Sequence, residues 1–500
     1  MDTNHLVDAL RQAPHAATFA IDAATGAVTT HGALWDMAAR HAAALIGLGV
    51  QPGCRVALQV EKSIAGLACY LGTVMAGAVH LPLNTAYPGA EVAYFLTDAA
   101  PRVFICDPAR LAELAPVAQA AGVTHVLTLN ADGAGSLADA AAEAAPLTRP
   151  VPRGPDDLAA FLYTSGTTGR SKGAMLSHDA LLSNALTLRD LWQFTDNNTL
   201  IHALPVFHTH GLFVAINVTL LAGGAIILHR SFDPAAVLAD FGRATALMGV
   251  PTFYVRLLDQ PGLTPDAVAG MRVFISGSAP MLMDTHARWQ ARTGHTVLER
   301  YGMTETNMTT SNPCVGLRKP GTVGLPLPGV DLRIVDDAGQ AVAAGTPGGI
   351  EVRGPNLFQG YWQMPDKTAA DMRPGGWFAT GDIGTQDGDG YVTIVGRSKD
   401  LIITGGFNVY PKEVESVIDA LDGVVESAAF GLPDADLGEV VAVAVVLAPG
   451  AVLTAEGIVG GTAGRLARFK QPRQVHLMDA LPRNTMGKVQ KAALRAMFGA

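Results

Sequence analysis

Five serines and threonines, three glycines and two cations are concentrated in residues 163–173. Glycine lets the backbone turn sharply and approach a ligand closely. Successive backbone N–H groups and hydroxyls form a concave anion site, to which Lys172 adds a point charge. The spacing of the common phosphate loop, G-x-x-x-x-G-K-[ST], cannot be aligned with this segment. We therefore predict a differently built loop that binds nucleotide phosphates, against the alternative of a flexible surface loop.

The elements that must position this loop alternate along the chain. An apolar run at 158–163 predicts a buried strand before the loop, and 174–178 leads into an apolar-periodic helix. Upstream, predicted helices at 30–50, 63–76 and 91–99 alternate with predicted strands at 55–60, 79–83 and 103–106. Further strands are predicted at 199–203, 224–228, 246–250 and 271–276. This alternation favours right-handed β-α-β units and an α/β fold with largely parallel sheets.

The character of the chain changes near residue 321. Glycine and proline become frequent, and short alternating segments such as 331–335 and 349–353 predict a small β-barrel or sheet. A stretch rich in glycine and charge, 397–410, is a candidate domain junction. The residues beyond it predict a small α+β domain with a helix at 411–420 and strands at 424–430, 440–447 and 475–478.

Composition argues against several classes of function. The 500 residues are 49% hydrophobic, and the formal net charge of −9 argues against nucleic acid as a partner. Four scattered cysteines indicate a reducing, cytoplasmic compartment and neither a disulfide framework nor a zinc site. Residues 1–20 lack the apolar core of a signal peptide. The apolar stretch 212–228 is slightly short for a membrane span, so a buried helix, a glycine turn and a buried strand are expected there, and no membrane partner.

Six further stretches carry polar or charged side chains in a definite order. They are 204–211 (Leu-Pro-Val-Phe-His-Thr-His-Gly), 276–280 (Ser-Gly-Ser-Ala-Pro), 299–306 (Glu-Arg-Tyr-Gly-Met-Thr-Glu-Thr), 377–382 (Trp-Phe-Ala-Thr-Gly-Asp), 396–400 (Gly-Arg-Ser-Lys-Asp) and 482–488 (Pro-Arg-Asn-Thr-Met-Gly-Lys). Together with the glycine-rich loop, they resemble the core motifs of the adenylate-forming acyl-CoA synthetases over nearly the whole chain. One such motif is a weak signal, but the ordered set is very specific.

This resemblance implies a fold and a reaction. The fold is α/β: a large N-terminal adenylation domain of two α/β sheets plus a small β-barrel at 1–397, a hinge at 398–400, and a small mobile α+β C-terminal domain at 401–500. The reaction has two halves. A carboxylate attacks the α-phosphate of ATP to give acyl-AMP and pyrophosphate, and the thiolate of coenzyme A then displaces AMP. ATP, Mg²⁺ and coenzyme A are therefore the expected cofactors and co-substrates.

The resemblance also implies which residues bind the nucleotide. Both half-reactions develop negative charge, so fixed donors and cations are the main tools. Glu305 and Thr164 would hold Mg²⁺, which prefers oxygen ligands. Asp382 would accept both ribose hydroxyls, with Arg397 as an added donor. The full expected set is Thr164, Ser165, Gly166, Thr167, Thr168, Gly169, Lys172, Gly277, Ser278, Ala279, Glu299, Arg300, Tyr301, Gly302, Met303, Thr304, Asp382 and Arg397.

Catalysis is expected from Lys488, together with Glu305 and Lys172. The Lys488 ammonium, brought to the α-phosphate bridge, would stabilise the adenylation transition state. Lys399 would act at the hinge, and the path of the pantetheine arm would be lined by Gly405, Gly406 and Phe407. Acetylation would remove the charge of Lys488, so a lysine acetyltransferase and a deacetylase are hypothetical partners.

The acyl pocket is expected to be formed by His208, Arg256, Ser278, Gly302 and Met303. Pockets for fatty or aryl acids should be apolar throughout, but Arg256 ends a segment expected to line this one. A buried cation costs free energy unless it is paired, and a second carboxylate on the substrate would pair it bidentately. Arg256, the 299–308 stretch and the short chain resemble the malonyl-CoA synthetases, so the favoured substrate is a small dicarboxylate, malonate or methylmalonate. The alternative for Arg256 is a surface bond to an acidic neighbour such as Asp259.

Other functions stay open at this point. They are a medium-chain or aryl acyl-CoA ligase, a stand-alone adenylation module that loads a carrier protein, and a non-catalytic nucleotide-binding homologue. His208 and His210 lack a nearby third ligand for zinc. No Gly-x-Ser-x-Gly pattern surrounds Ser165 or Ser278, which argues against a serine hydrolase.

Overall fold

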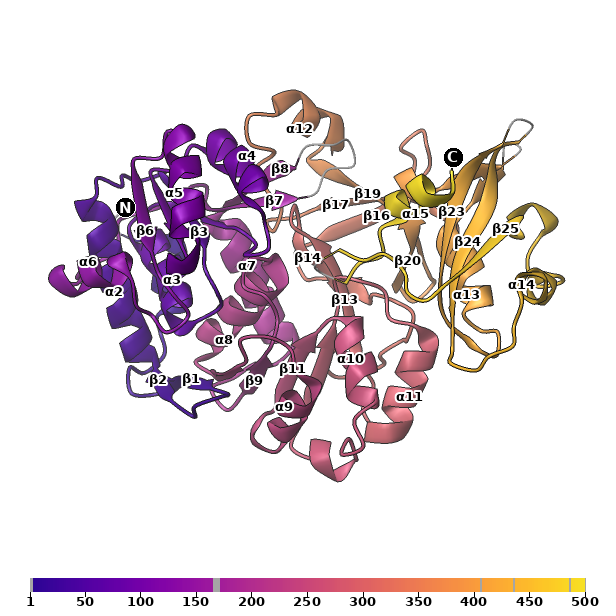
Figure 1. Cartoon of the computed structure of the whole chain (residues 1–500), viewed down its shortest axis with the longest axis horizontal. Coiled ribbons are helices and arrows are strands. Elements are labelled where there is room, and N and C mark those ends of the chain that lie inside the picture. Colours follow the sequence, from indigo (N-terminus) through magenta and orange to yellow (C-terminus); the bar gives the residue numbers. More distant parts are fainter. Residues whose placement is uncertain (1–2, 165–170, 405–406, 435–436, 485–486, 500) are drawn as a thin grey trace. The chain divides into compact units, whose positions relative to one another are not determined.

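The computed structural model of the chain describes residues 3–164, 171–404, 407–434, 437–484 and 487–499 (Figure 1). Its contacts divide it into two compact units. The larger unit comprises Met1–Asp331 and Arg353–Ala370, and the smaller comprises Leu332–Val352 and Asp371–Ala500. The domain boundary expected at 397–400 stays a prediction, since the contact-based division falls elsewhere.

One sheet of the larger unit has the strand order β6-β5-β3-β4-β7-β8. Its parallel strands are β3 (Arg55–Gln59), β4 (Val79–Pro82), β5 (Val103–Cys106), β6 (His125–Thr128) and β7 (Leu158–Thr164), and β8 (Lys172–Ser177) runs antiparallel to β7. The helices in this part are α2 (His31–Gly47), α3 (Ile64–Met75), α4 (Gly89–Ala99), α5 (Leu111–Ala120) and α6 (Ser136–Glu143). Side-chain caps begin several of them, for example Ser63 on the Gly66 amide of α3.

The second sheet has the order β15-β14-β13-β12-β11-β9-β10-β1-β2. Its strands are β1 (Thr18–Asp22), β2 (Val28–Thr30), β9 (Thr199–His202), β10 (Ala225–Leu228), β11 (Ala246–Gly249), β12 (Val273–Ser276), β13 (Leu298–Met303), β14 (Asn307–Ser311) and β15 (Leu325–Pro326). The accompanying helices are α1 (His5–Leu10), α7 (His178–Leu191), α8 (Asn217–Ala222), α9 (Pro234–Ala239), α10 (Pro251–Leu258), α11 (Met283–Thr293) and α12 (Pro365–Asp371).

The central strands of this sheet are buried along their length, as expected for parallel strands covered on both faces. Ligands of α/β folds bind beyond the carboxyl ends of such strands. Those ends lie at His202, Gly249, Ser276 and Met303. The motifs at 204–211, 276–280 and 299–306, which follow or end these strands, therefore meet at one edge of this sheet.

The smaller unit contains two sheets. Residues 331–397 take the sheet form of the expected barrel or sheet, with β16 (Asp331–Val335), β17 (Gly348–Arg353), β18 (Met372–Arg373), β19 (Trp377–Gln386) and β20 (Val392–Arg397). The other sheet contains β21 (Ile402–Thr404), β22 (Phe407–Val409), β23 (Val424–Asp434), β24 (Gly438–Leu447) and β25 (Gln474–Met478), with helices α13 (Pro411–Ile418), α14 (Ala455–Thr462) and α15 (Lys491–Phe498).

Two local predictions can be judged directly. The prediction that 174–178 leads into a helix is confirmed, because α7 begins at His178. Residues 174–177 themselves belong to β8, a strand that the sequence did not predict. The prediction for 212–228 is confirmed: a buried π-helical turn and α8 are followed by Gly223 in the left-handed region and by buried β10. Within the described residues, every helix is too short or too polar to cross a bilayer.

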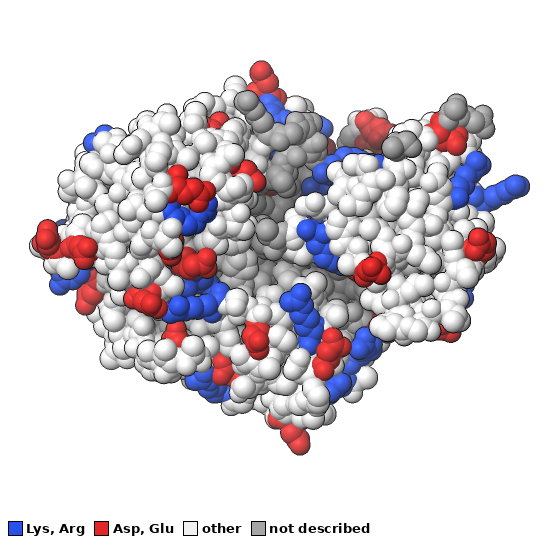
Figure 2. All heavy atoms as spheres, in the orientation of Figure 1, with Lys and Arg blue, Asp and Glu red and all other residues white. Residues whose placement is uncertain are grey.

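Positive and negative side chains are interspersed on the face shown in Figure 2. Proteins that bind nucleic acid usually gather Lys and Arg into a stripe or patch. The described residues on this face present mixed charge instead, in keeping with the net charge of −9.

Candidate functional site

The β7–β8 hairpin carries the predicted phosphate loop at its tip. Thr164 pairs with Lys172 at the end of the hairpin, and the residues between them that were assigned to the nucleotide (Ser165, Gly166, Thr167, Thr168 and Gly169) lie outside the described part of the chain. Below the tip, the ring of Phe161 fills the space where a Gly173 side chain would stand, 1.9 Å from an added Cβ. Tyr163 donates a hydrogen bond to the Asp98 carboxylate at 2.6 Å. Aromatic packing thus fixes the base of the hairpin.

Lys172 and Glu305 are brought together by a residue that the sequence did not identify, Tyr361. The Tyr361 hydroxyl donates to Glu305 Oε1 at 2.9 Å, and Lys172 Nζ lies 4.1 Å from the centroid of the Tyr361 ring. Both Tyr361 and Glu305 are buried, and the Glu305 carbonyl accepts from the Phe358 amide at 2.8 Å. One side chain therefore orients a carboxylate and supports a cation through its π face.

The side chains present fit a magnesium ion that is bound together with a nucleotide. Mg²⁺ typically takes one or two protein carboxylates and completes its shell with phosphate oxygens and water. Glu305 is one such carboxylate, on a rigid buried turn. No group of three or more His, Cys, Asp or Glu in the described residues could hold a metal by itself, and His208 and His210 do not belong to one.

The turn after β12 is held from below by Glu299. Its two carboxylate oxygens accept from the Met281 amide at 3.1 Å and from His286 Nε2 at 2.7 Å. The turn also contains Ser278 at φ +69°, an uncommon conformation for a residue other than glycine. Both Glu299 oxygens are used inside the protein, so we assign Glu299 to the support of the 277–281 turn rather than to direct contact with a nucleotide.

The β13–β14 hairpin closes tightly beside this turn. An added Cβ at Gly302 would lie 1.9 Å from the Asn307 carbonyl oxygen, and Asn307 itself has φ +48°. Tyr301, Gly302 and Met303 are half-buried on this hairpin, and Thr304 is buried beside Glu305. Gly277 is buried while Ala279 is half-buried. The predicted adenine and acyl residues of the larger unit are therefore neighbours.

Arg300 is the unusual residue of this region. It is 3% exposed, and its Nε and Nη2 have no hydrogen-bond partner among the described residues. Burial lowers the pKa of Arg300 to about 9. The guanidinium lies against Gly277, where an added Cβ would be 2.4 Å from Arg300 Cζ. Among the described residues, Arg300 is thus a buried cation without an anionic partner.

Other polar groups near Arg300 are also unpartnered. Burial, followed by the charge of Arg300, lowers the pKa of His208 to about 4 and that of His210 well below its usual value, so both rings are neutral. His210 Nδ1 lies 3.4 Å from Ser278 Oγ. Within the described residues, the buried polar atoms without a hydrogen-bond partner here are His208 Nδ1, Thr209 Oγ1, His210 Nε2, Ser276 Oγ and Arg300 Nε and Nη2. Buried polar groups are normally hydrogen-bonded, so this concentration indicates a binding site for a polar, anionic ligand.

The buried position expected for Arg256 is wrong. Arg256 is exposed near the end of α10, where Tyr254, Leu257 and Leu258 face the core. The described residues show no ion pair between Arg256 and Asp259 either. Because Arg256 is exposed to solvent, its charge does not need a paired anion. The free-energy cost of an unpaired buried charge applies instead to the guanidinium of Arg300.

The smaller unit carries the predicted ribose residues on one ladder. Asp382 and Arg397 are opposite each other on β19 and β20, and Arg397 Nε lies 2.9 Å from Asp382 Oδ1. Asp382 is 3% exposed. Its amide donates to Thr380 Oγ1 at 3.1 Å, and Gly381 takes φ +72°, which glycine tolerates. The carboxylate is thus held in a fixed position beside a cation.

The remaining predicted residues of this unit lie in turns. Lys399 is exposed in a 3₁₀ turn, and partial burial of its ammonium lowers the pKa of Lys399 although the nearby Asp400 carboxylate raises it. Lys488 is also exposed and closes a turn in which its amide donates to Asn484 Oδ1 at 2.9 Å. Phe407 is 57% exposed and stacks on Phe469, with 4.7 Å between ring centroids. Gly405 and Gly406 lie outside the described residues.

Replacing Tyr361 with phenylalanine keeps the ring under Lys172 but removes the hydrogen bond to Glu305. We expect the Mg²⁺ concentration for half-maximal ATP–pyrophosphate exchange to rise about tenfold, since a partner that orients a metal ligand typically contributes 10- to 100-fold. Tyr391→Phe, at a buried tyrosine outside this cluster, is the control. An unchanged magnesium requirement in Tyr361→Phe would contradict the orienting role.

Comparison with known proteins gives a consistent result. The family model described as AMP-binding enzyme matches residues 7–362, and the model of the AMP-binding enzyme C-terminal domain matches 413–488. A feruloyl-CoA synthase from Amycolatopsis sp. is 36% identical over 98% of this chain and 97% of its own length. A malonate–CoA ligase from Arabidopsis thaliana is 32% identical over 90% of this chain and 79% of its own length.

A solved structure covers the whole chain. It is the crystal structure of ATP-bound MatB from Rhodopseudomonas palustris, with 55% identity, a TM-score of 0.97, and coverage of 100% of this chain and 99% of that one.

Proposed function

Because this chain belongs to the AMP-binding enzyme family and is an acyl-CoA ligase, we propose that the acid it joins to coenzyme A is malonate or methylmalonate. The observation that carries this proposal is the Arg300 guanidinium, whose Nε and Nη2 have no partner in the described part of the chain and which is buried among His208, His210, Gly277 and Ser278. A small dicarboxylate brings a second anion to that cation while its first carboxylate reacts.

A buried charge without a partner costs free energy. Removing one partner of a buried ion pair typically costs about 3–5 kcal/mol, because the other charge stays buried and uncompensated. A bound monocarboxylic acid would leave the Arg300 guanidinium buried without an anion. A distal carboxylate would instead accept two parallel hydrogen bonds from Nε and Nη2, the fork geometry that guanidinium and carboxylate share.

The relatives are in keeping with this acid without singling it out. One is named a malonate–CoA ligase and another a feruloyl-CoA synthase, so the family scaffold accepts acids of very different size. An apolar or aryl acid is the alternative. It would leave the unpartnered polar atoms around Arg300 without hydrogen bonds, which is the physical reason to rank it second.

In the first half-reaction, we propose that Lys172 and the hairpin tip with Thr164 bind the β- and γ-phosphates. Glu305 would hold Mg²⁺ when it is bound, and the ion would neutralise charge on the departing pyrophosphate. Asp382 and Arg397 would retain the ribose. Lys488 would donate to the α-phosphate bridge as charge accumulates there, which is where fixed donors lower a barrier most.

In the second half-reaction, the thiolate of coenzyme A attacks the acyl carbon and AMP leaves. The exposed Phe407, stacked on Phe469, would pack along the pantetheine arm after Lys399 and its neighbours change conformation. Arg300 would continue to bind the distal carboxylate and prevent it from becoming a competing nucleophile.

A panel of acids with ATP and free coenzyme A tests the proposal. AMP release and the thioester product are measured for malonate, methylmalonate, succinate, propionate, benzoate, ferulate and octanoate. Malonate and propionate form the matched pair, since they differ only by a carboxylate in place of a methyl group. We expect kcat/KM for malonate to exceed that for propionate by about 100-fold or more, because a site built for a polar group rejects the analogue that lacks it.

Two outcomes would contradict the proposal. Preference for ferulate, benzoate or octanoate would make the chain an aryl or medium-chain acyl-CoA ligase. Formation of malonyl-AMP without transfer to free coenzyme A would favour an adenylation module that loads a carrier protein.

A further inference from the structure

Lys62, in the turn between β3 and α3, is a second buried cation of the larger unit. It is 6% exposed, and burial lowers its pKa to about 7. Its ammonium donates to the carbonyl oxygens of His202 at 3.1 Å and Leu204 at 2.9 Å, and lies 3.4 Å from His202 Nδ1. All three acceptors are at the start of the segment that carries His208 and His210.

The other end of that segment is bound through His202. Its Nε2 lies 2.7 Å from the Gly211 carbonyl oxygen, so this nitrogen carries the proton and Nδ1 is left to accept from Lys62. Gly211 in turn touches the Pro205 carbonyl oxygen, which would be 2.0 Å from an added Cβ. Lys62 and His202 therefore close residues 204–211 into a loop with both ends fixed.

We propose that Lys62 is a positioning residue for the acyl site. This role rests on the proposed function of His208, Thr209 and His210, whose unpartnered atoms must face the acid. Those three side chains lie between the two points that Lys62 and His202 fix, where the chain enters a buried π-helical turn, His210–Ile216. Lys62 reaches the loop through the protein and contacts no acid itself.

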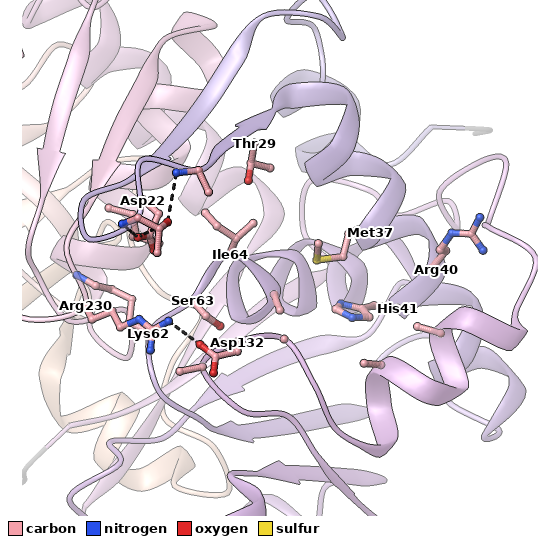
Figure 3. A pocket seen from close by; sticks show the side chains of 18 of the residues that line it. Asp22, Thr29, Met37, Arg40, His41, Lys62, Ser63, Ile64, Asp132 and Arg230 are labelled. Carbon is pink, nitrogen blue, oxygen red and sulfur yellow. Dashed lines mark hydrogen bonds and ion pairs between the residues drawn. The ribbon is translucent and has the colours of Figure 1, made fainter. Parts of the chain in front are cut away.

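A cavity of about 740 Å³ makes the proposal testable by chemical rescue. Lys62 lines it together with Arg230 and Asp132, and with His41 and Met37 from α2 (Figure 3). Asp132 is already bound by Arg230 at 2.7 Å. Asp22, another carboxylate of the cavity, accepts from the amides and hydroxyl of its own turn. A small amine that enters through this cavity could therefore take the place of a deleted Lys62 side chain.

The experiment compares Lys62→Met, Lys62→Ala and Lys62→Arg with Arg230→Ala in the full-length enzyme. Arg230→Ala removes a cation from the same cavity without touching the 204–211 loop. We expect Lys62→Met to raise KM for malonate about tenfold or more while KM for ATP stays within about twofold, since small misplacements of binding groups are costly. Ethylammonium should lower the raised KM of Lys62→Ala several-fold and leave Arg230→Ala unchanged.

Several results would overturn the inference. One is equal effects on the KM of malonate and ATP; another is a lower melting temperature with an unchanged KM. A third is no response of Lys62→Ala to the amine together with full activity of Lys62→Met. Because Lys62→Met keeps most of the aliphatic length of the side chain and removes its charge, it decides the question if Lys62→Ala does not fold. Should the acid panel select a different acid, the KM of that acid replaces malonate in the same comparison, so failure of the substrate assignment and failure of the positioning role are distinguishable.

Discussion

Lys488→Ala is expected to lower adenylation about 100- to 1,000-fold, the usual effect of deleting one donor aimed at developing charge. Thioester formation from supplied malonyl-AMP should stay within about threefold, because the α-phosphate bridge is no longer being broken. ATP–pyrophosphate exchange measures the first half-reaction, and release of malonyl-CoA from synthetic malonyl-AMP measures the second. Lys412→Ala is the control, since in the described part of the chain the Lys412 ammonium makes one long ion-pair contact, at 4.0 Å from Asp419. Equal loss of both half-reactions would contradict the assignment.

The same lysine predicts a pH dependence. Although Lys488 is an exposed residue, protein atoms crowd its ammonium. Burial, followed by Arg397 and opposed by Asp382, lowers the pKa of Lys488 to about 8. Only the protonated form stabilises the transition state, so adenylation should fall as pH rises through about 8. Adenylation by Lys488→Arg should not decrease over this pH range, because a guanidinium stays charged.

If Lys488 is acetylated in the cell, a deacetylase should raise adenylation by purified enzyme and leave the second half-reaction unchanged.

Arg300→Met is expected to lower kcat/KM for malonate by roughly 30- to 5,000-fold, which corresponds to the about 2–5 kcal/mol of a buried, hydrogen-bonded charge pair. The same substitution should leave propionate unaffected or improve it, because the unpaired cation is gone. Steady-state kinetics with both acids measure the reversal. Arg256→Met is the competing variant, and a larger effect there than at Arg300 would return the distal carboxylate to Arg256.

Stability provides an independent readout for Arg300→Met. Burial lowers the pKa of Arg300 from its ordinary value to about 9, so the protonated side chain destabilises the folded chain. That destabilisation is fully present below about pH 9 and diminishes as pH rises toward the unfolded value. Replacing the cation with the apolar methionine side chain should therefore give a melting temperature at or above that of the parent chain at neutral pH. A large decrease would mean that Arg300 is structural.

The ordered motifs were sufficient to predict the family, the α/β fold and the acyl-CoA ligase chemistry. They were not sufficient for contacts between distant segments. Tyr361 donates a hydrogen bond to Glu305 although the two residues are 56 positions apart in the sequence, and no local sequence pattern predicts that contact. The strand at 172–177 was missed because its partner, β7, pairs with it across the loop, whereas helical periodicity is judged from local residues alone.

The exposed position of Arg256 could have been predicted from the sequence. Tyr254, Leu257 and Leu258 stand at helical spacings i, i+3 and i+4, so Val255 and Arg256 face outward. Arg300 is a different case. Strand alternation predicts opposite faces for Glu299 and Arg300, yet both are buried because the 204–211 loop and the 277–281 turn cover the end of β13. Only the three-dimensional arrangement shows that both Glu299 carboxylate oxygens accept hydrogen bonds, whereas Arg300 Nε and Nη2 have no partner among the described residues.

The contact between Gly277 and Arg300 constrains how this enzyme can be redesigned. A side chain at 277 and the guanidinium at 300 compete for one space, with an added Cβ only 2.4 Å from Arg300 Cζ. Libraries that vary position 277 alone should yield inactive enzymes, and those that vary 300 alone should leave a void. Acceptance of bulkier, uncharged acids should therefore appear among double variants in which 300 becomes small while 277 gains a side chain.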